Sequence, residues 1–293
     1  MLNRFSIQEI STLTGIKAHT LRIWEQRYNI PKPKRTSTNI RFYDDDDLKL
    51  LLNISLLNNE GHRISQIAKL TAEEINVRVI EYASHSNDLT VHLQALTSAT
   101  LNLDEASFER VLSTSILQIG MERTMSEVIF PFLKKIGEMW MSGSMQPAYE
   151  HFISNLIRQK LIVAIDGQVR VSQKHQHKYL VFLPEGETHE LGLLFANYMI
   201  RSRGHIAIYL GQSTPLVDLE KISLKFQPDF LFMTLTAGRL RKSLFDYIRV
   251  LTEKFPAAKI ILTGQYAISQ KENLPAGTLV IESTEQFVRL LEE

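Results

Sequence analysis

Cysteine is absent from this sequence, and its absence excludes disulfide bonds, thiolate metal sites and cysteine nucleophiles. Long apolar runs are absent as well: no stretch approaches the roughly 18 apolar residues of a membrane-spanning helix. The N-terminus MLNRFSIQEI also lacks the apolar core of a secretory signal peptide. These absences predict a soluble, cytoplasmic protein that does not enter a membrane.

Several common catalytic motifs are missing too. The chain has no Gly-x-Gly-x-x-Gly, Walker A, Gly-x-Ser-x-Gly or His-Glu-x-x-His pattern. These patterns position phosphates, nucleophiles or zinc in nucleotide-binding proteins, hydrolases and zinc proteases. The sequence therefore gives no support for those enzymes, and we expect a protein that is not an enzyme.

Charge is balanced overall but unevenly distributed. The net charge is +1 for 293 residues, whereas residues 1–43 contain eight Lys and Arg against two Glu, a local charge of 8 − 2 = +6. The acidic run from Asp44 to Asp47 ends this basic segment. Clustered positive charge attracts phosphate, so we expect a polyanion to bind at this end of the chain.

The periodicity of apolar residues predicts a multidomain protein with α and α/β parts. Residues 1–75 contain short helical patterns broken by glycine and proline, which indicates a small helical domain with a hairpin. Residues 87–170 contain four stretches with helical spacing, which predict a four-helix bundle. Residues 177–293 alternate short apolar runs with helical patterns, which predicts a five-stranded, doubly wound parallel sheet of the flavodoxin-like type.

The N-terminal domain has the pattern of a helix-turn-helix. Ser6 and Glu9 have capping-box spacing, which predicts a helix start. Gly15 provides a turn into a second helix at about 18–27, whose Leu21 and Trp24 share one face that we assign to the core. The opposite, polar face suits a major groove. The basic segment PKPKRTSTNIRFY that follows is typical of a β-hairpin wing whose cations meet phosphates.

The motif TLRIWEQRY, followed by Arg41-Phe42-Tyr43 and an acidic helix start, resembles the N-terminus of MerR-type transcriptional regulators over residues 4 to about 72. Asn39 stands where many relatives have glycine. The resemblance implies a winged helix-turn-helix that binds a double-stranded DNA operator as a homo-oligomer, a dimer or a tetramer. It implies DNA contacts from Thr20, Arg22, Tyr28, Arg41 and Tyr43, and the polar and basic pattern adds Lys17, His19, Arg27, Lys34 and Arg35.

A histidine stands in the loop after the first strand of the predicted sheet. Pro184 ends that strand, and Glu187, Thr188 and His189 follow at the edge where such sheets bind ligands. An imidazole there can ligate a transition metal, and Glu187 can accept the other ring N–H and fix the tautomer. The alternative is a histidine that only decorates a helix start.

This loop resembles the cobalamin-binding motif Asp-x-His-x-x-Gly, with Glu187 in place of the aspartate. The resemblance implies that His189 is the lower axial ligand of cobalt and that Gly192 allows close approach. Thr234-Leu235-Thr236 follows after 41 residues, where that family has Ser-x-Leu, and Gly264-Gln265 after 27 more, where it has Gly-Gly. The resemblance also implies a slot for the nucleotide tail of the corrinoid. The residues implied to line it, besides Thr188 of the loop, are Thr234, Thr236, Gly264 and Gln265.

The predicted bundle carries a second part of this pattern. Nine residues separate Trp140 from Glu150-His151, and residues 129–161 resemble the helical cap of cobalamin-dependent MerR-type photoreceptors. The resemblance implies that Trp140 covers the upper side of the cofactor and that Glu150 and His151 border it. A core tryptophan and an exposed Glu-His pair are the alternative. Some light-sensing relatives have histidine after the tryptophan, where this chain has Met141.

Together these features predict a transcriptional regulator whose operator binding is controlled by cobalamin, either adenosylcobalamin, with light as a candidate signal, or methylcobalamin. The cobalamin would lie between the helical bundle and the sheet domain. Two alternatives stay open from the sequence. One is a cobalamin-independent MerR-type regulator that keeps a corrinoid fold for protein interaction, and the other is a corrinoid carrier module for methyl transfer.

Overall fold

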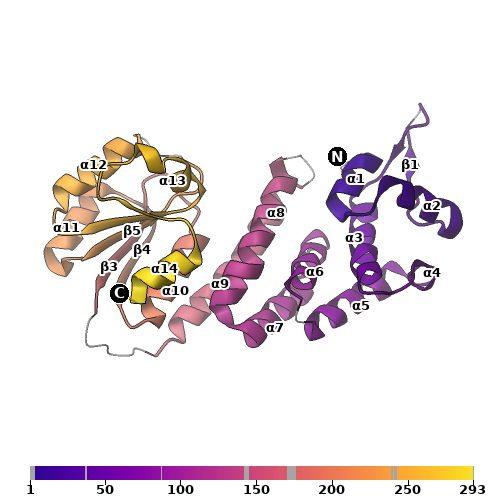
Figure 1. The fold of residues 1–293 in the computed structure, drawn as a ribbon, viewed down its shortest axis with the longest axis horizontal. Coiled ribbons are helices and arrows are strands. Elements are labelled where there is room, and N and C mark those ends of the chain that lie inside the picture. Colours follow the sequence, from indigo (N-terminus) through magenta and orange to yellow (C-terminus); the bar gives the residue numbers. More distant parts are fainter. Residues whose placement is uncertain are drawn as a thin grey trace. The chain divides into compact units, whose positions relative to one another are not determined.

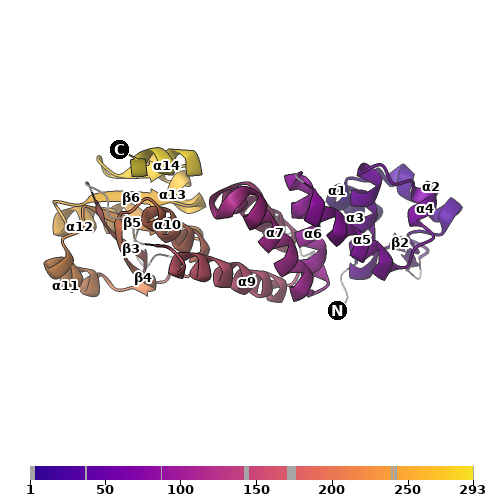
Figure 2. The same ribbon diagram turned by 90° about the horizontal axis from the view of Figure 1, so that it is seen from below.

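The structure is a computed structural model, and it describes residues 4–36, 38–86, 88–141, 145–169, 176–238, 240 and 243–292. The chain divides into two compact units, Met1–Leu156 and Ile157–Glu293, which can be followed along the colour scale in Figures 1 and 2. The first unit is helical apart from one hairpin, and the second contains a parallel sheet. The predicted combination of α and α/β parts is therefore confirmed. Within the described ranges, no helix is long and apolar enough to span a membrane.

Two helices form the predicted helix-turn-helix. The Ser6 hydroxyl accepts the N–H of Glu9, and the Glu9 carboxylate accepts the N–H of Ser6, so a capping box starts the first helix. That helix ends at Gly15 with a φ of 74°, a left-handed conformation that glycine adopts without strain. The helices are α1 (Ile7–Thr14) and α2 (Ala18–Tyr28).

An antiparallel hairpin follows α2 and forms the predicted wing. Its turn contains Asn39 with a φ of 64°, and asparagine enters this left-handed region more readily than most residues, so it can replace the glycine of relatives. Phe5 joins the wing through two backbone hydrogen bonds with Tyr43, of 2.8 and 2.9 Å. The strands are β1 (Lys34–Arg35) and β2 (Arg41–Phe42).

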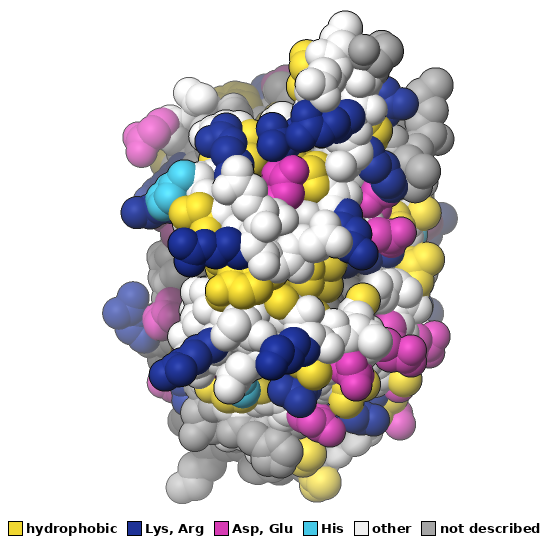
Figure 3. Space-filling model, turned by 90° about the vertical axis from the view of Figure 1, so that its right-hand side faces the viewer, with side chains coloured by type: hydrophobic (Ala, Val, Ile, Leu, Met, Phe, Trp, Pro, Cys, Tyr) yellow, Lys and Arg dark blue, Asp and Glu magenta, His cyan; other side chains and the backbone are white. Residues whose placement is uncertain are grey.

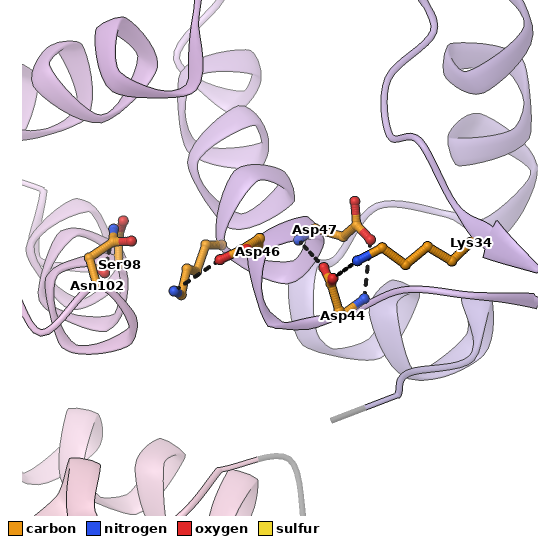
Figure 4. A network of polar contacts seen from close by, with 7 residues as sticks. Lys34, Asp44, Asp46, Asp47, Ser98 and Asn102 are labelled. Atoms are coloured by element: carbon orange, nitrogen blue, oxygen red, sulfur yellow. Dashed lines mark hydrogen bonds and ion pairs between the residues drawn. The ribbon is translucent and has the colours of Figure 1, made fainter. Parts of the chain in front are cut away.

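Helix α3 (Asp45–Asn59) is the central element of the first unit. It begins at a second capping box, in which Asp44 and Asp47 each accept the backbone N–H of the other, and Figure 4 shows Lys34 of the wing reaching Asp44 there. Its residues from Leu51 to Leu57 are all buried, and it contacts α1 on one side and α5 and α6 on the other. This helix therefore joins the helix-turn-helix and its wing to the helices that follow.

All four helical stretches predicted between residues 87 and 170 are present. The second and third stretches are separated by a kink at Gly120, which has a φ of 81° inside a continuous helical run. A π-helical segment, η1, follows this kink, and π-helical turns are frequent at functional sites. Helices α4 (Ile64–Ile67) and α5 (Ala72–His85) precede this region, and the helices within it are α6 (Leu89–Leu101), α7 (Glu105–Arg123), η1 (Thr124–Ile129), α8 (Phe130–Met141) and α9 (Pro147–Asp166).

The second unit contains the predicted five-stranded parallel sheet. Its strand order is β4-β3-β5-β6-β7. Strand β4 therefore lies on one side of β3, and β5, β6 and β7 follow on the other side. Ligands of such flavodoxin-like sheets bind where the order reverses, beyond the carboxyl ends of the two strands, which here are β3 and β5. The strands are β3 (Lys178–Pro184), β4 (Ile206–Thr214), β5 (Phe230–Thr234), β6 (Lys259–Thr263) and β7 (Leu279–Ile281).

Helices cover both faces of this sheet, as a doubly wound fold requires. Leu180, Leu231 and Leu262 belong to one apolar cluster with residues of α11, α12 and α13. The opposite face contacts α10 and α14, where the Phe232 and Phe287 rings lie 5.0 Å apart. The elements are α10 (Leu191–Ser202), α11 (Leu216–Phe226), α12 (Leu244–Lys254), α13 (Gln265–Ser269), the 3-10 helix η2 (Lys271–Asn273) and α14 (Thr284–Glu292).

Candidate functional site

Helix α2 has the two faces that the sequence predicts. Leu21 and Trp24 are buried, at 0% and 6% exposure, which confirms their assignment to the core. The opposite face exposes the predicted residues His19, Arg22 and Arg27, whereas Thr20 and Tyr28 are half-buried. Figure 3, which looks onto the end of the molecule carrying α2 and the wing, shows Lys and Arg side chains spread across this surface. The geometry suits a helix that enters a groove of DNA.

Two residues on the exposed face of α2 are missing from the sequence prediction. Ile23 is 43% exposed, and Gln26 is exposed as well. They follow His19 by four and seven residues, so helical spacing from that histidine is the signal that places them on its face. An exposed isoleucine can contact a thymine methyl group, and a glutamine can bond the edge of adenine.

Two predicted phosphate contacts are ion-paired inside the domain. Arg41 donates from Nε to the Glu25 carboxylate at 3.0 Å, and Lys34 bonds the Asp44 carboxylate. These pairs tie the wing to α2 and α3. Their charge is partly neutralised, so exposed cations without such a partner on the described part of the wing or on α3, such as Arg22, contribute more to phosphate attraction. Arg35 is exposed and donates to the Asn39 side chain at 2.9 Å.

The structure corrects one predicted DNA contact, that of Tyr43. The side chain is 0% exposed, so it cannot reach a phosphate in this conformation. Burial, followed by the nearby Glu25 carboxylate, raises the pKa of the Tyr43 hydroxyl. The sequence could not show this, because a tyrosine that follows a two-residue strand can face either side. We assign Tyr43 to the core that supports the wing.

Glu187 organises the loop between β3 and α10. Its carboxylate is 1% exposed. One oxygen accepts the backbone N–H groups of Thr188 and His189, at 2.9 and 3.0 Å, and the His189 Nδ1 at 2.5 Å. The other oxygen accepts the N–H groups of Thr236 and Ala237, both at 3.2 Å. A single buried carboxylate therefore joins the loops that follow β3 and β5, and the hydrogen bond predicted between Glu187 and His189 is present.

The charge of Glu187 decides the tautomer of His189. Burial alone would raise the pKa of Glu187, but hydrogen bonds from the His189 ring and from backbone N–H groups lower it to about 2. The carboxylate is then ionised at neutral pH and can only accept, so Nδ1 of His189 carries the proton. A neutral His189 ring therefore has its lone pair on Nε2, the form that binds a metal. The side chain is 44% exposed.

Gly192 allows helix α10 to lie close to the end of β5. A Cβ atom on Gly192 would lie 2.9 Å from Cγ2 of Thr234, so α10 approaches the end of β5 more closely than any other residue would allow. Thr234 is 4% exposed, and its Oγ1 has no hydrogen-bond partner among the described residues. Such a buried hydroxyl is expensive to leave unpaired. A polar group of a ligand would satisfy it.

Three of the four remaining predicted residues of this loop cluster are exposed. Thr188, Thr236 and Gln265 are exposed, so the glutamine that replaces a glycine does not fill buried space. Gly264 precedes Gln265 with a φ of 98°, and a Cβ atom there would lie 2.4 Å from the carbonyl oxygen of Leu235. The loops after β5 and β6 are thus in backbone contact.

The predicted cap residues lie in the first unit. Trp140, near the end of α8, is 51% exposed, which excludes a core role in this conformation. His151 Nδ1 lies 3.3 Å from Glu150, and the other Glu150 oxygen accepts the Ser154 hydroxyl at 2.6 Å. Because these residues belong to one unit and His189 to the other, their joint contribution to one site stays a prediction.

These features define a class: a winged helix-turn-helix protein with a flavodoxin-like sheet that presents a carboxylate-oriented histidine. Comparison with known proteins gives the family. The family described as "MerR HTH family regulatory protein" matches residues 5–74, and that described as "B12 binding domain" matches residues 92–164. The HTH-type transcriptional repressor CarH of Myxococcus xanthus is 30% identical over 266 residues, which cover 89% of this chain and 88% of CarH. The chain belongs to this family of MerR-type transcriptional regulators with a B12-binding domain.

Two further similarities extend over most of the chain. The HTH-type transcriptional repressor CarA of Myxococcus xanthus is 26% identical over 291 residues, covering 97% of this chain and 95% of CarA. Among solved structures, the Methanosarcina barkeri monomethylamine corrinoid protein is 15% identical and covers 76% of this chain and 99% of that protein, with a TM-score of 0.43. That score is too low for the structural likeness to support an inference.

Proposed function

We propose that this protein regulates transcription by binding operator DNA through its winged helix-turn-helix, and that a cobalamin controls this binding. The observation that carries the proposal is the bond between the buried, ionised Glu187 and Nδ1 of His189 at the switch point of the sheet. It prepares the imidazole as a metal ligand in the way that second-shell carboxylates do. The family relationship to the repressors CarH and CarA supports the DNA-binding output.

The residues present fit a cobalamin. It would supply a cobalt ion, and an imidazole nitrogen is a donor that suits this class of metal. His189 would be that ligand and the buried, unpartnered Thr234 hydroxyl would bond the nucleotide tail. In the first unit, the exposed Trp140 would contact the cobalamin, together with Glu150 and His151. Adenosylcobalamin and methylcobalamin are both candidates.

Control of DNA binding requires that the cobalamin prefer one state of the protein over another. We propose that the two states differ in self-association, with a dimer or tetramer binding the operator more tightly because it engages two half-sites. A ligand that binds one assembly better shifts the population toward it, and the operator affinity changes by the same coupling.

The proposal predicts that the purified protein retains adenosylcobalamin or methylcobalamin through gel filtration in the dark. Substituting His189→Ala should lower corrinoid affinity at least 10-fold, the size of effect seen when metal sites lose even a supporting partner, and change the visible spectrum. His177→Ala is the matched control, because His177 precedes β3 at the opposite end of the strand. Absence of corrinoid from wild-type fractions would overturn the cofactor assignment, and an unchanged spectrum in His189→Ala would overturn the ligand assignment.

A second prediction concerns the exposed face of α2. Arg22→Ala should weaken binding to a random-sequence duplex and reduce the slope of log affinity against log salt by about 1, because one phosphate contact is lost. Ile23→Ala removes an exposed apolar side chain from the adjacent position and should leave the slope unchanged. Fluorescence anisotropy at several salt concentrations measures both. Equal slopes for wild type and Arg22→Ala would place Arg22 away from the phosphates.

A further inference from the structure

Helix α9 belongs to both units of the chain. It is one continuous helix of 20 residues, Pro147–Asp166, and the boundary between the units falls between Leu156 and Ile157. Its first turn carries Glu150 and lies in the first unit, whereas its second half lies in the second unit with the sheet. Whatever holds that second half can act on the first half, because a helix transmits displacement along its axis.

The second half of α9 is bonded to Glu190, the residue that follows His189. Arg158 bonds the Glu190 carboxylate from Nε, and the other Glu190 oxygen accepts the Tyr209 hydroxyl at 3.1 Å. The Glu190 side chain is 10% exposed, whereas that of Arg158 is 48% exposed. Farther along, Gln168 donates to the Tyr198 carbonyl at 3.0 Å. We call Arg158, Glu190 and Tyr209 the Glu190 latch.

Glu190 of the latch directly follows His189, the candidate cobalt ligand, along the chain. Glu187 fixes the N–H of His189, and Glu190 is the N-cap residue of α10, which begins one residue later. A shift of the His189 backbone therefore moves Glu190. Because a nearly buried carboxylate is costly to separate from its cation, Arg158 and α9 must follow such a shift or lose the ion pair.

We propose that the Glu190 latch is the connection by which the state of the His189 loop is passed to helix α9 and so to the first unit. Arg158 and Tyr209 are positioning residues, and neither is part of the predicted cobalamin contacts. Within the first unit, Asn76 of α5 joins α3 to α6, because it accepts hydrogen bonds from Asn53 of α3 and Ser98 of α6, both at 3.4 Å. The proposal rests on the proposed function, since the signal it transmits is cobalamin binding.

The test compares Arg158→Gln and Tyr209→Phe with the wild type. Lys254→Gln is the control, because Lys254 forms a 2.6 Å ion pair with Glu220 elsewhere on the same unit. The ratio of affinities for a duplex selected from a random pool, with and without methylcobalamin in the dark, gives the coupling factor. We expect Arg158→Gln to reduce this factor by about 5-fold, a value discounted for the exposure of the arginine, and Tyr209→Phe to reduce it less. The visible spectrum of bound corrinoid should persist in both.

Two results would overturn the proposal. One is an unchanged coupling factor in Arg158→Gln, and the other is loss of the bound corrinoid from that variant, which would make Arg158 part of the binding site. A ligand-free measurement separates the latch from the proposed function: amide exchange across 157–166 should be about 5-fold faster in Arg158→Gln and unchanged in Lys254→Gln. If the wild type binds no cobalamin, the proposed function fails. If amide exchange across 157–166 in Arg158→Gln is also as slow as in the wild type, the Glu190 latch fails as well.

Discussion

Replacing Glu187 with glutamine is expected to destabilise the second unit by about 3 kcal/mol at pH 7, the free energy that corresponds to the lowering of its pKa from 4.5 to about 2. The carboxylate accepts five hydrogen bonds from N–H groups, two on the oxygen that faces β5 and three on the other. A glutamine amide has only one accepting oxygen, and its NH₂ group would face N–H donors. The loops after β3 and β5 would lose their common anchor.

This contribution has a defined dependence on pH. Because the pKa of Glu187 is lower in the folded state, its stabilisation is complete above about pH 4.5 and is lost as the pH falls toward 2. The difference in unfolding free energy between wild type and Glu187→Gln should therefore shrink to about half its neutral value near pH 3. Amide exchange of β3 and β5 at several pH values measures this difference.

Two controls accompany the Glu187 experiment. Glu253→Gln removes an exposed carboxylate on α12, and such surface changes are usually within about 0.5 kcal/mol. Both tryptophans, Trp24 and Trp140, lie in the first unit, so tryptophan fluorescence during urea unfolding should be the same in wild type and variant. A difference in stability that does not vary between pH 7 and pH 3 would mean that Glu187 acts through packing and not through its charge.

The sequence predicts features that depend on neighbours along the chain. The capping box at Ser6, the left-handed turn at Gly15 and the bond between Glu187 and His189 each join residues no more than four positions apart, so spacing alone defines them. The strands of the sheet are likewise predictable, because their apolar runs are continuous and short. The switch point between β3 and β5 then follows from the alternation of strands and helices.

Features that depend on distant partners were not predictable. Charge patterning identifies Arg41 and Lys34 as cations, but their partners Glu25 and Asp44 are set by how the wing folds back on α2 and α3. The prediction for Tyr43 was wrong for the same reason, since burial is decided by the tertiary fold. The Glu190 latch joins residues 32 and 19 positions apart, and no periodicity connects them.

Gly264→Ala is expected to destabilise the second unit by about 4 kcal/mol. One part of this cost is backbone strain, because the conformation of Gly264 is open almost only to glycine. The other part is the overlap of the added Cβ atom with its packed surroundings. Gly264 has φ and ψ of 98° and 158°, and the added Cβ would lie 2.4 Å from the Leu235 carbonyl oxygen, which cannot move aside as a flexible side chain could. That same oxygen accepts the N–H of Tyr266 at 3.1 Å, so a shift would also disturb the start of α13.

Gly277→Ala separates the two causes. Gly277 has a φ of 87° and nothing within 4 Å of the added Cβ, so only the backbone term of about 1 to 2 kcal/mol applies. Amide exchange of β5 and β6 measures the loss of stability in both variants. Equal losses in Gly264→Ala and Gly277→Ala would show that the overlap at residue 264 is relieved at no cost. A larger loss of stability in Gly264→Ala than in Gly277→Ala, as expected, would mean that packing requires glycine at position 264 whether or not a cofactor binds. Cobalamin binding instead depends on Glu187, His189 and the unpaired hydroxyl of Thr234. Thr234→Val should therefore leave the fold intact and weaken corrinoid binding.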